Sequence, residues 1–280
     1  MSATAETSRP VVRRAADWIV QDAVRDRLSP KAAWLTFWSP IVGWVVLAIL
    51  FVVARPAFYV LLQEDQVVEW AQFSLCLFTA VAAGVALWQI RFRPRFAGVL
   101  LALVAVGCFF LAGEEISWAQ RVIGIETPPA LATANQQSET NLHNINIGLD
   151  PQILFKLASV GLGLAGLVGI VAVRVLGRGG AWARLLAPPA ATTPGFAGIV
   201  AYWLIMLATG NAVAPLLRFQ EWVECALYIS LAASVVAVVL RAQPSRSAVS
   251  VLRWAATGTV ALTVLFAILT PLSGVTPGNV

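Results

Sequence analysis

The residues best suited to chemistry in this sequence are glutamates that stand near a histidine, or near one another, at helical spacing. Glu139 and His143 are four residues apart and Glu221 and Glu224 are three apart, so each pair can share one face of a helix. His143 is the only histidine, and any imidazole chemistry must use it. Carboxylate and imidazole bind divalent metal ions, which activate water for hydrolysis or, as iron or manganese, support oxidative chemistry.

Three further glutamates stand beside predicted membrane spans, namely Glu69, Glu114 and Glu115. If they converge with the two pairs, their charges repel in a poorly screened interface, and a divalent cation would compensate. The predicted catalytic residues are Glu114, Glu115, Glu139 and His143. The predicted ligands of a divalent metal cofactor are Glu69, Glu115, His143, Glu221 and Glu224. The predicted substrate-binding residues are Arg55, Arg121, Trp118 and Asn141.

Each of these residues also has a purely structural explanation. The acids can pair with the arginines Arg55, Arg121 and Arg218, and so hold loops against the helices. Pro56 should kink or end the helix that carries Arg55, and an ion pair with Asp65 or Glu69 is the plainest role for this arginine. Trp118 suits a headgroup-level aromatic belt as well as it suits stacking on a sugar.

The chain that must position these residues is too apolar for a soluble domain. Of its 280 residues 59% are hydrophobic and 12% are charged, where about 25% charge is usual. The apolar stretches run for roughly 20 residues without alternation, which indicates helices that cross a bilayer rather than barrel strands. We predict an all-α integral membrane protein with about seven transmembrane helices, near residues 40–62, 71–90, 96–113, 152–173, 195–213, 222–240 and 254–273.

Charge sets the predicted topology. Arginine clusters at 91–95, 174–184 and 241–253 share one side with the basic N-terminal segment, and the positive-inside rule makes that side cytoplasmic. The N-terminus is then cytoplasmic, the C-terminus is outside, and the predicted site faces outward from the plasma membrane. The net charge of +5 has no soluble basic domain to carry it, so nucleic acid is not an expected partner.

Two parts of the chain are predicted around this bundle. Residues 1–33 contain an amphipathic helix suited to the inner leaflet, and 34–280 form one transmembrane domain with a long outer loop at 114–150. Ser39 and Pro40 have the residue types of a helix cap and first turn. Thr127 and Pro128 predict a short helix from about 128 to 136 within the loop.

The outer loop resembles an uncharacterised family of bacterial multi-pass membrane proteins, in which Glu-Glu-x-Ser-Trp-x-Gln-Arg is followed by Asn-Leu-His-Asn. The matching residues are Glu114, Glu115, Ser117, Trp118, Gln120 and Arg121, then Glu139, Asn141, Leu142, His143 and Asn144. The resemblance covers about residues 60–145, and the family pattern has glycine where this chain has Ala119. It implies a shared architecture in a bacterial inner membrane and implies no activity.

Two classes of function are compatible with these features. The first is a membrane-embedded enzyme that acts on a lipid or a lipid-linked headgroup at the outer face. The second is a non-enzymatic component, such as a receptor, an assembly partner or a transporter subunit, which docks through an acidic outer face. Glycosyl transfer by the Glu64–Asp65 pair is a weaker third hypothesis, because that loop is short. The spans hold almost no ionisable residue near their centres, which disfavours a proton pump or ion channel.

Overall fold

The computed structural model describes residues 11–63, 66–90, 95–120, 125–135, 140–142, 145, 152–209 and 214–272. These residues form helices and connections, with an isolated bridge between Asn135 and Ile145. Seven helical stretches are long and apolar enough to cross a membrane. The prediction of an all-α multi-pass membrane protein with seven spans is therefore confirmed, while the direction in which the chain crosses the membrane stays a prediction.

The order of the helices is α1 (Val11–Arg25), α2 (Pro30–Val53), α3 (Arg55–Leu61), α4 (Val67–Ile90), α5 (Arg95–Glu115), η1 (Ser117–Ala119), α7 (Pro129–Ala134), α8 (Gln152–Gly169), η2 (Ile170–Val175), α9 (Ala181–Leu186), η3 (Ala190–Thr192), α10 (Thr193–Thr209), α11 (Ala214–Arg241) and α12 (Arg246–Leu272). The loop helix α7 agrees with the predicted one to within about two residues.

The first span begins ten residues before its predicted start. Ser29 caps α2 by accepting a hydrogen bond from the backbone N–H of Ala32 at 3.1 Å, and Pro30 occupies the first turn. Pro40 lies inside the helix, so its predicted place in a first turn was wrong. A proline is tolerated within a transmembrane helix when neighbouring groups satisfy the backbone nearby. Here the indole Nε1 of Trp222 donates to the carbonyl of Pro40 at 3.1 Å.

The first span ends where Pro56 was expected to end it. α2 stops at Val53, and Arg55 and Pro56 open the short helix α3. The side chain of Arg55 is exposed, and its guanidinium carbon lies 4.6 Å from the centre of the Phe51 ring. Of the two expected partners of Arg55, Asp65 lies outside the described residues.

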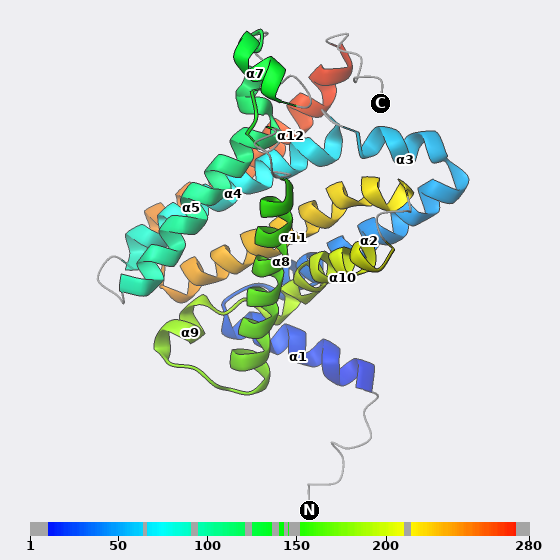
Figure 1. The fold of residues 1–280 in the computed structure, drawn as a ribbon. Coiled ribbons are helices and arrows are strands. Elements are labelled where there is room, and N and C mark those ends of the chain that lie inside the picture. The colour runs from blue at the N-terminus through cyan, green and yellow to red at the C-terminus, as the bar shows by residue number, and fades with distance from the viewer. Residues whose placement is uncertain are drawn as a thin grey trace, which may run out of the picture.

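Helices α4 and α11 form the centre of the bundle (Figure 1). Half of the α4 span, 56% of the span that contains α10 and 67% of the α11 span are buried inside the protein, against 11% of α2 and 6% of α12. α5 and α12 pack on α4, while α2 and α10 pack on α11. A Cβ on Gly195 of α10 would lie 2.2 Å from the carbonyl oxygen of Ala226, so glycine permits the close approach of α10 to α11.

The central helices run in parallel, which gives the bundle two chemically different ends. Glu69 and Glu221 lie near the starts of α4 and α11. Val85 of α4 packs with Val238 of α11 near the other end, where α11 finishes at Arg241. We call these the acidic end and the basic end of the bundle.

At the basic end, α1 is tied to the bundle by an ionic network. Asp26 is 2% exposed and accepts hydrogen bonds from Nη2 of Arg174 at 2.8 Å and from Nε of Arg241 at 2.7 Å. Asp22, also 2% exposed, accepts from the backbone N–H of Ala190 at 2.7 Å and lies 3.4 Å from Nη1 of Arg174. The sequence predicted the helix of the N-terminal segment but not that its acids bind arginines of two spans.

We expect Asp26→Asn to weaken the fold strongly. An asparagine removes the buried anion that Arg174 and Arg241 share and leaves Asp22 as the anion beside Arg174, and breaking a buried ion pair costs about 3–5 kcal/mol. The control is Arg14→Gln, which removes an exposed charge from α1. Thermal unfolding of the purified protein in detergent would show the difference, and equal melting temperatures for the two variants would contradict it.

Asp22 should make the stability depend on pH. Burial raises the pKa of the Asp22 carboxyl above its ordinary value, against the opposing effects of the Ala190 N–H and Arg174. The folded protein therefore holds the Asp22 proton more tightly than the unfolded chain does. Binding of this proton stabilises the fold at low pH, and that contribution is lost as the pH rises through the raised pKa. We expect Asp22→Asn to remove this part of the pH dependence of the melting temperature. An unchanged pH profile would show that Asp22 does not titrate in this way.

Candidate functional site

Four of the predicted glutamates, carried by three helices, come together at the acidic end. Glu69 lies in the first turn of α4, Glu115 is the last residue of α5, and Glu221 and Glu224 lie in α11. The carboxyl group of Glu115 lies within electrostatic range of those of Glu224, Glu69 and Glu221. We call these four residues the glutamate cluster.

The arrangement of the helices explains this convergence. α4 and α5 are antiparallel neighbours, so the start of α4 lies beside the end of α5, and α11 packs on α4. The side-chain Nε2 of Gln72 donates to the backbone carbonyl of Glu221 and lies 3.4 Å from its Oε2. Gln72 is fully buried, one helical turn after Glu69, and fixes α4 against α11 at the level of the cluster.

Hydroxyl, amide and ammonium groups surround the cluster. The hydroxyl of Tyr228 donates to Oε1 of Glu115 at 3.3 Å, and Nε2 of Gln220 donates to Oε1 of Glu224 at 2.8 Å. Lys156 of α8 lies within electrostatic range of Glu224, with its ammonium 5.2 Å from the centre of the Trp203 ring. Tyr228 and Gln220 are neutral donors, which orient the carboxyl groups of Glu115 and Glu224 without adding charge.

Spacing along α11 could have predicted Tyr228, since it follows Glu224 by four residues and Glu221 by seven, on one helix face. Gln72 follows Glu69 by three residues in the same way. Its second amide atom, Oε1, is buried and has no hydrogen-bond partner among the described residues. A buried acceptor of this kind beside carboxylates is a place for a donor from a ligand or a water molecule. Lys156 carries no such signal, because it comes from a helix distant in sequence.

Glu114 serves a different purpose from its neighbour Glu115. It is 3% exposed, and its two oxygens accept hydrogen bonds at 2.7 Å from the indole Nε1 of Trp118 and from the backbone N–H of Leu142. The bond from Leu142 joins the end of α5 to a segment 28 residues further along the chain. The geometry of Glu114 therefore agrees with the structural explanation, in which the carboxylate holds the loop.

A tight turn after Glu115 folds Trp118 back onto Glu114. Ser117 and Trp118 have φ angles of 46° and 55°, the left-handed region that non-glycine residues rarely occupy. The turn brings the Trp118 ring back over Gly113, where a Cβ would lie 2.8 Å from the ring. Trp118 remains 42% exposed, so it can contact a substrate as well as bind Glu114.

Side-chain hydrogen bonds order the described parts of the outer loop. Asn141 is buried, accepts from Nδ2 of Asn135 at 2.7 Å and donates to the Ser117 hydroxyl oxygen at 3.2 Å. Oε1 of Gln120 accepts from the backbone N–H of Thr140 at 2.8 Å. Asn141, predicted to bind substrate, thus has contacts within the loop, and Asn135 is a partner that spacing did not identify.

Several predicted residues cannot be placed. Glu139, His143 and Arg121 lie outside the described residues, as do Glu64 and Asp65 of the glycosyl-transfer hypothesis. Within the described ranges, no three His, Cys, Asp or Glu side chains are arranged to hold a metal ion. The four described members of the predicted metal site, Glu69, Glu115, Glu221 and Glu224, therefore do not form a coordination site by themselves. A metal site that includes Glu139 or His143 stays a prediction.

Searches against protein-family models, curated proteins and solved structures found no match to this chain.

The different surroundings of Glu114 and Glu115 predict opposite effects of the same substitution. Glu114→Gln replaces one of two acceptor oxygens with an amide donor, and leaving a buried N–H unpaired costs about 1–3 kcal/mol. Glu115→Gln removes a charge that its three neighbours repel and leaves an amide that Tyr228 can still bind. We expect the melting temperature to fall in Glu114→Gln and to stay level or rise in Glu115→Gln.

Thermal unfolding and limited proteolysis of the outer loop would measure both effects, with exposed Glu126→Gln as the control. If Glu115→Gln destabilises the protein as much as Glu114→Gln does, Glu115 belongs to the structural contacts and not to a strained cluster.

Proposed function

We propose that this protein is a membrane-embedded enzyme that uses the glutamate cluster for acid–base chemistry on a lipid or lipid-linked headgroup. The observation that carries the proposal is the convergence of Glu69, Glu115, Glu221 and Glu224 from three helices. Ionisable groups within membrane spans are costly, and they mark functional sites by default.

Crowded carboxyl groups suit proton transfer. When like charges lie close together they cannot all ionise, so one group retains a proton while another acts as the base. Glu115, bound by the hydroxyl of Tyr228, is the candidate base that takes a proton from a reacting water or hydroxyl group. Glu224, oriented by Gln220, is the candidate acid for the leaving group.

The substrate class follows from the position of the cluster. The glutamates lie within about three turns of the helix ends, near the depth of lipid headgroups, where an amphiphilic substrate arrives by diffusion in the membrane. Lys156 near Glu224 offers a positive charge to an anionic headgroup, as do Arg121 and Arg55 in the sequence-based proposal. The divalent ion proposed from the sequence, held with help from Glu139 and His143, would supply activation of water.

The charge pattern supports an outward-facing site in a bacterial inner membrane, with the N-terminus in the cytoplasm and the C-terminus outside. In this orientation the basic end, with Arg174 and Arg241, faces the cytoplasm. The cluster would then meet substrates on the periplasmic side.

The non-enzymatic alternative requires acids that a partner protein can reach. Glu114 is buried, and the four residues of the glutamate cluster are only partly exposed, with bonds inside the bundle or loop. A docking surface would instead carry its acids on exposed loops. The limited exposure of these five acids therefore favours the enzyme, whereas Glu126 of the loop is exposed and could serve either function.

We expect Glu115→Gln and Glu224→Gln to abolish turnover while the protein still folds and inserts. Tyr228→Phe should lower turnover less, because it removes one hydrogen bond to the base and keeps both carboxyl groups. The measurement is a comparison by mass spectrometry of lipids and lipid-linked intermediates from cells that express wild type, each variant, or exposed Glu126→Gln as the control.

Intact turnover in both Gln variants, with wild-type amounts of protein in the membrane, would reject the acid–base role. If expression of the wild-type protein does not change the lipid profile, the docking alternative is favoured. Capture of a partner protein by wild type, but not by Glu115→Gln, would then support that alternative.

A further inference from the structure

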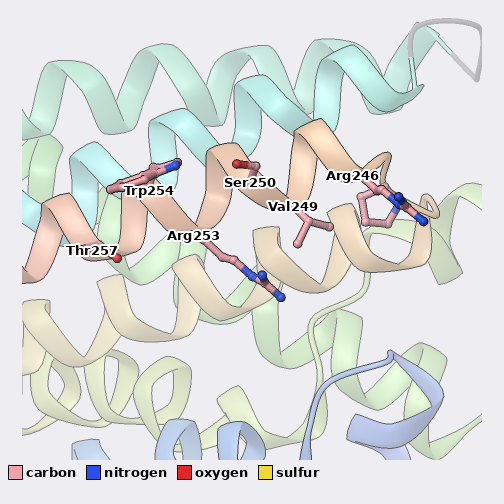
Figure 2. Close-up of a pocket in the computed structure, with 7 residues that line it drawn as sticks. Arg246, Val249, Ser250, Arg253, Trp254 and Thr257 are labelled. Carbon is pink, nitrogen blue, oxygen red and sulfur yellow. The ribbon is translucent and has the colours of Figure 1, made fainter.

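Helix α12 has a continuous outer face that changes from basic to apolar along its length. A polar groove at its start is lined by Pro244, Arg246, Val249, Ser250, Arg253, Trp254 and Thr257. A second groove, lined by Ala256, Thr257, Val260, Ala261, Val264, Leu265 and Ile268, continues from it, and Thr257 lines both. Figure 2 shows that the labelled side chains of the polar groove project from α12 itself. The helix thus presents a single surface with a charged part and an apolar part.

We propose that this face binds one anionic phospholipid at the basic end of the bundle, with its phosphate at Arg246 and Arg253 and an acyl chain along the apolar groove. The site is separate from the glutamate cluster and does not depend on the proposed enzyme activity.

Charge favours an anionic headgroup. Arg246 and Arg253 are both exposed, and they are seven residues apart, two helical turns or about 10.5 Å on one face. α12 contains no Asp or Glu, so the groove offers no partner for the ammonium group of a zwitterionic lipid. Arg246 also lies in the first turn of α12, where the positive end of the helix dipole adds to the attraction for a phosphate.

The remaining polar residues suit the same ligand. Ser250, between the two arginines, and Thr257, at the junction of the grooves, bring hydroxyl groups that can bind phosphate or ester oxygens. Trp254 is 74% exposed, and an indole at this level belongs in the interfacial layer of a membrane. The polar groove has a volume of about 620 Å³, within the usual range for a small-molecule site.

The first part of the apolar groove fits one acyl chain. One leaflet of a bilayer contributes about 15 Å of hydrocarbon, or about ten residues of helix. A chain that starts at Arg253 therefore passes Thr257 and Ala261 and ends within the groove, whose far part lies toward the acidic end, where the Phe266 ring stacks on that of Trp70 at 4.3 Å. The chain has access because only 6% of the span is buried inside the protein.

The test measures lipid binding by native mass spectrometry of the purified full-length protein, titrated with phosphatidylglycerol or with phosphatidylcholine that has the same acyl chains. We expect wild type to prefer phosphatidylglycerol by about thirty-fold, because each arginine at a charged membrane surface contributes about five-fold. In R246Q/R253Q this preference should fall to about twofold or less. In R253Q alone, which serves if the double variant fails to fold, it should fall about five-fold.

The matched control is R178Q/R184Q, which removes two exposed arginines from the same end of the bundle outside the groove. It should keep the preference for phosphatidylglycerol. Ala261→Trp, which fills the apolar groove, should weaken binding of both lipids while the preference for the anionic one remains.

Three results would overturn the proposal. Equal loss of preference in the control would show that the general positive charge of this end, and not the groove, selects the lipid. An unchanged preference in the R246Q/R253Q and R253Q variants would show that the arginines do not bind the phosphate. A lipid-independent dimer that Ala261→Trp dissociates would show that a second copy of the chain occupies this face.

Discussion

The cost of placing charge in a medium that cannot solvate it governs this protein. Its spans are nearly free of ionisable residues except at their ends, and there the charged groups gather into two sets at opposite ends of α11. At the basic end, each buried carboxylate has an arginine and further hydrogen bonds. At the acidic end, four glutamates share neutral donors and the nearby Lys156. The first set joins carboxylates to arginines and is structural, whereas the second places four carboxyl groups of like charge near one another.

This contrast explains why the two sets differ in what they contribute. Asp22 of α1 and Asp26, which directly follows this helix, bring together the ends of two spans that are distant in sequence, at η2 and α11. The glutamates do not stabilise one another in this way, so their close placement needs an explanation other than stability. Proteins usually tolerate a destabilising group of like charges where that group serves function. α11 carries residues of both sets, and its close packing with α4 keeps them at fixed positions.

The sequence predicted the spans because hydropathy depends on length and composition alone. It located their ends less well, since a helix continues through charged turns that a hydropathy window excludes. α11 and α12 each begin eight residues before the predicted start, so Glu221 lies two turns inside its helix. Ser29–Pro30 and Ser39–Pro40 have the same cap pattern, and only tertiary contacts such as that of Trp222 with Pro40 decide which proline starts the helix.

For the candidate site, topology alone predicted that acids from different helices would meet, because alternate span ends share a side. It could not separate Glu114 from Glu115, since adjacent residues at the end of a helix differ only in the direction their side chains take. Successive residues of a helix point about 100° apart, so the rotation of α5 about its axis decides that Glu115, and not Glu114, faces α11. The left-handed turn at Ser117 and Trp118 then supplies a partner for Glu114, and no residue pattern announces this turn because glycine is absent from it. The strained backbone thus binds the glutamate that lies outside the cluster.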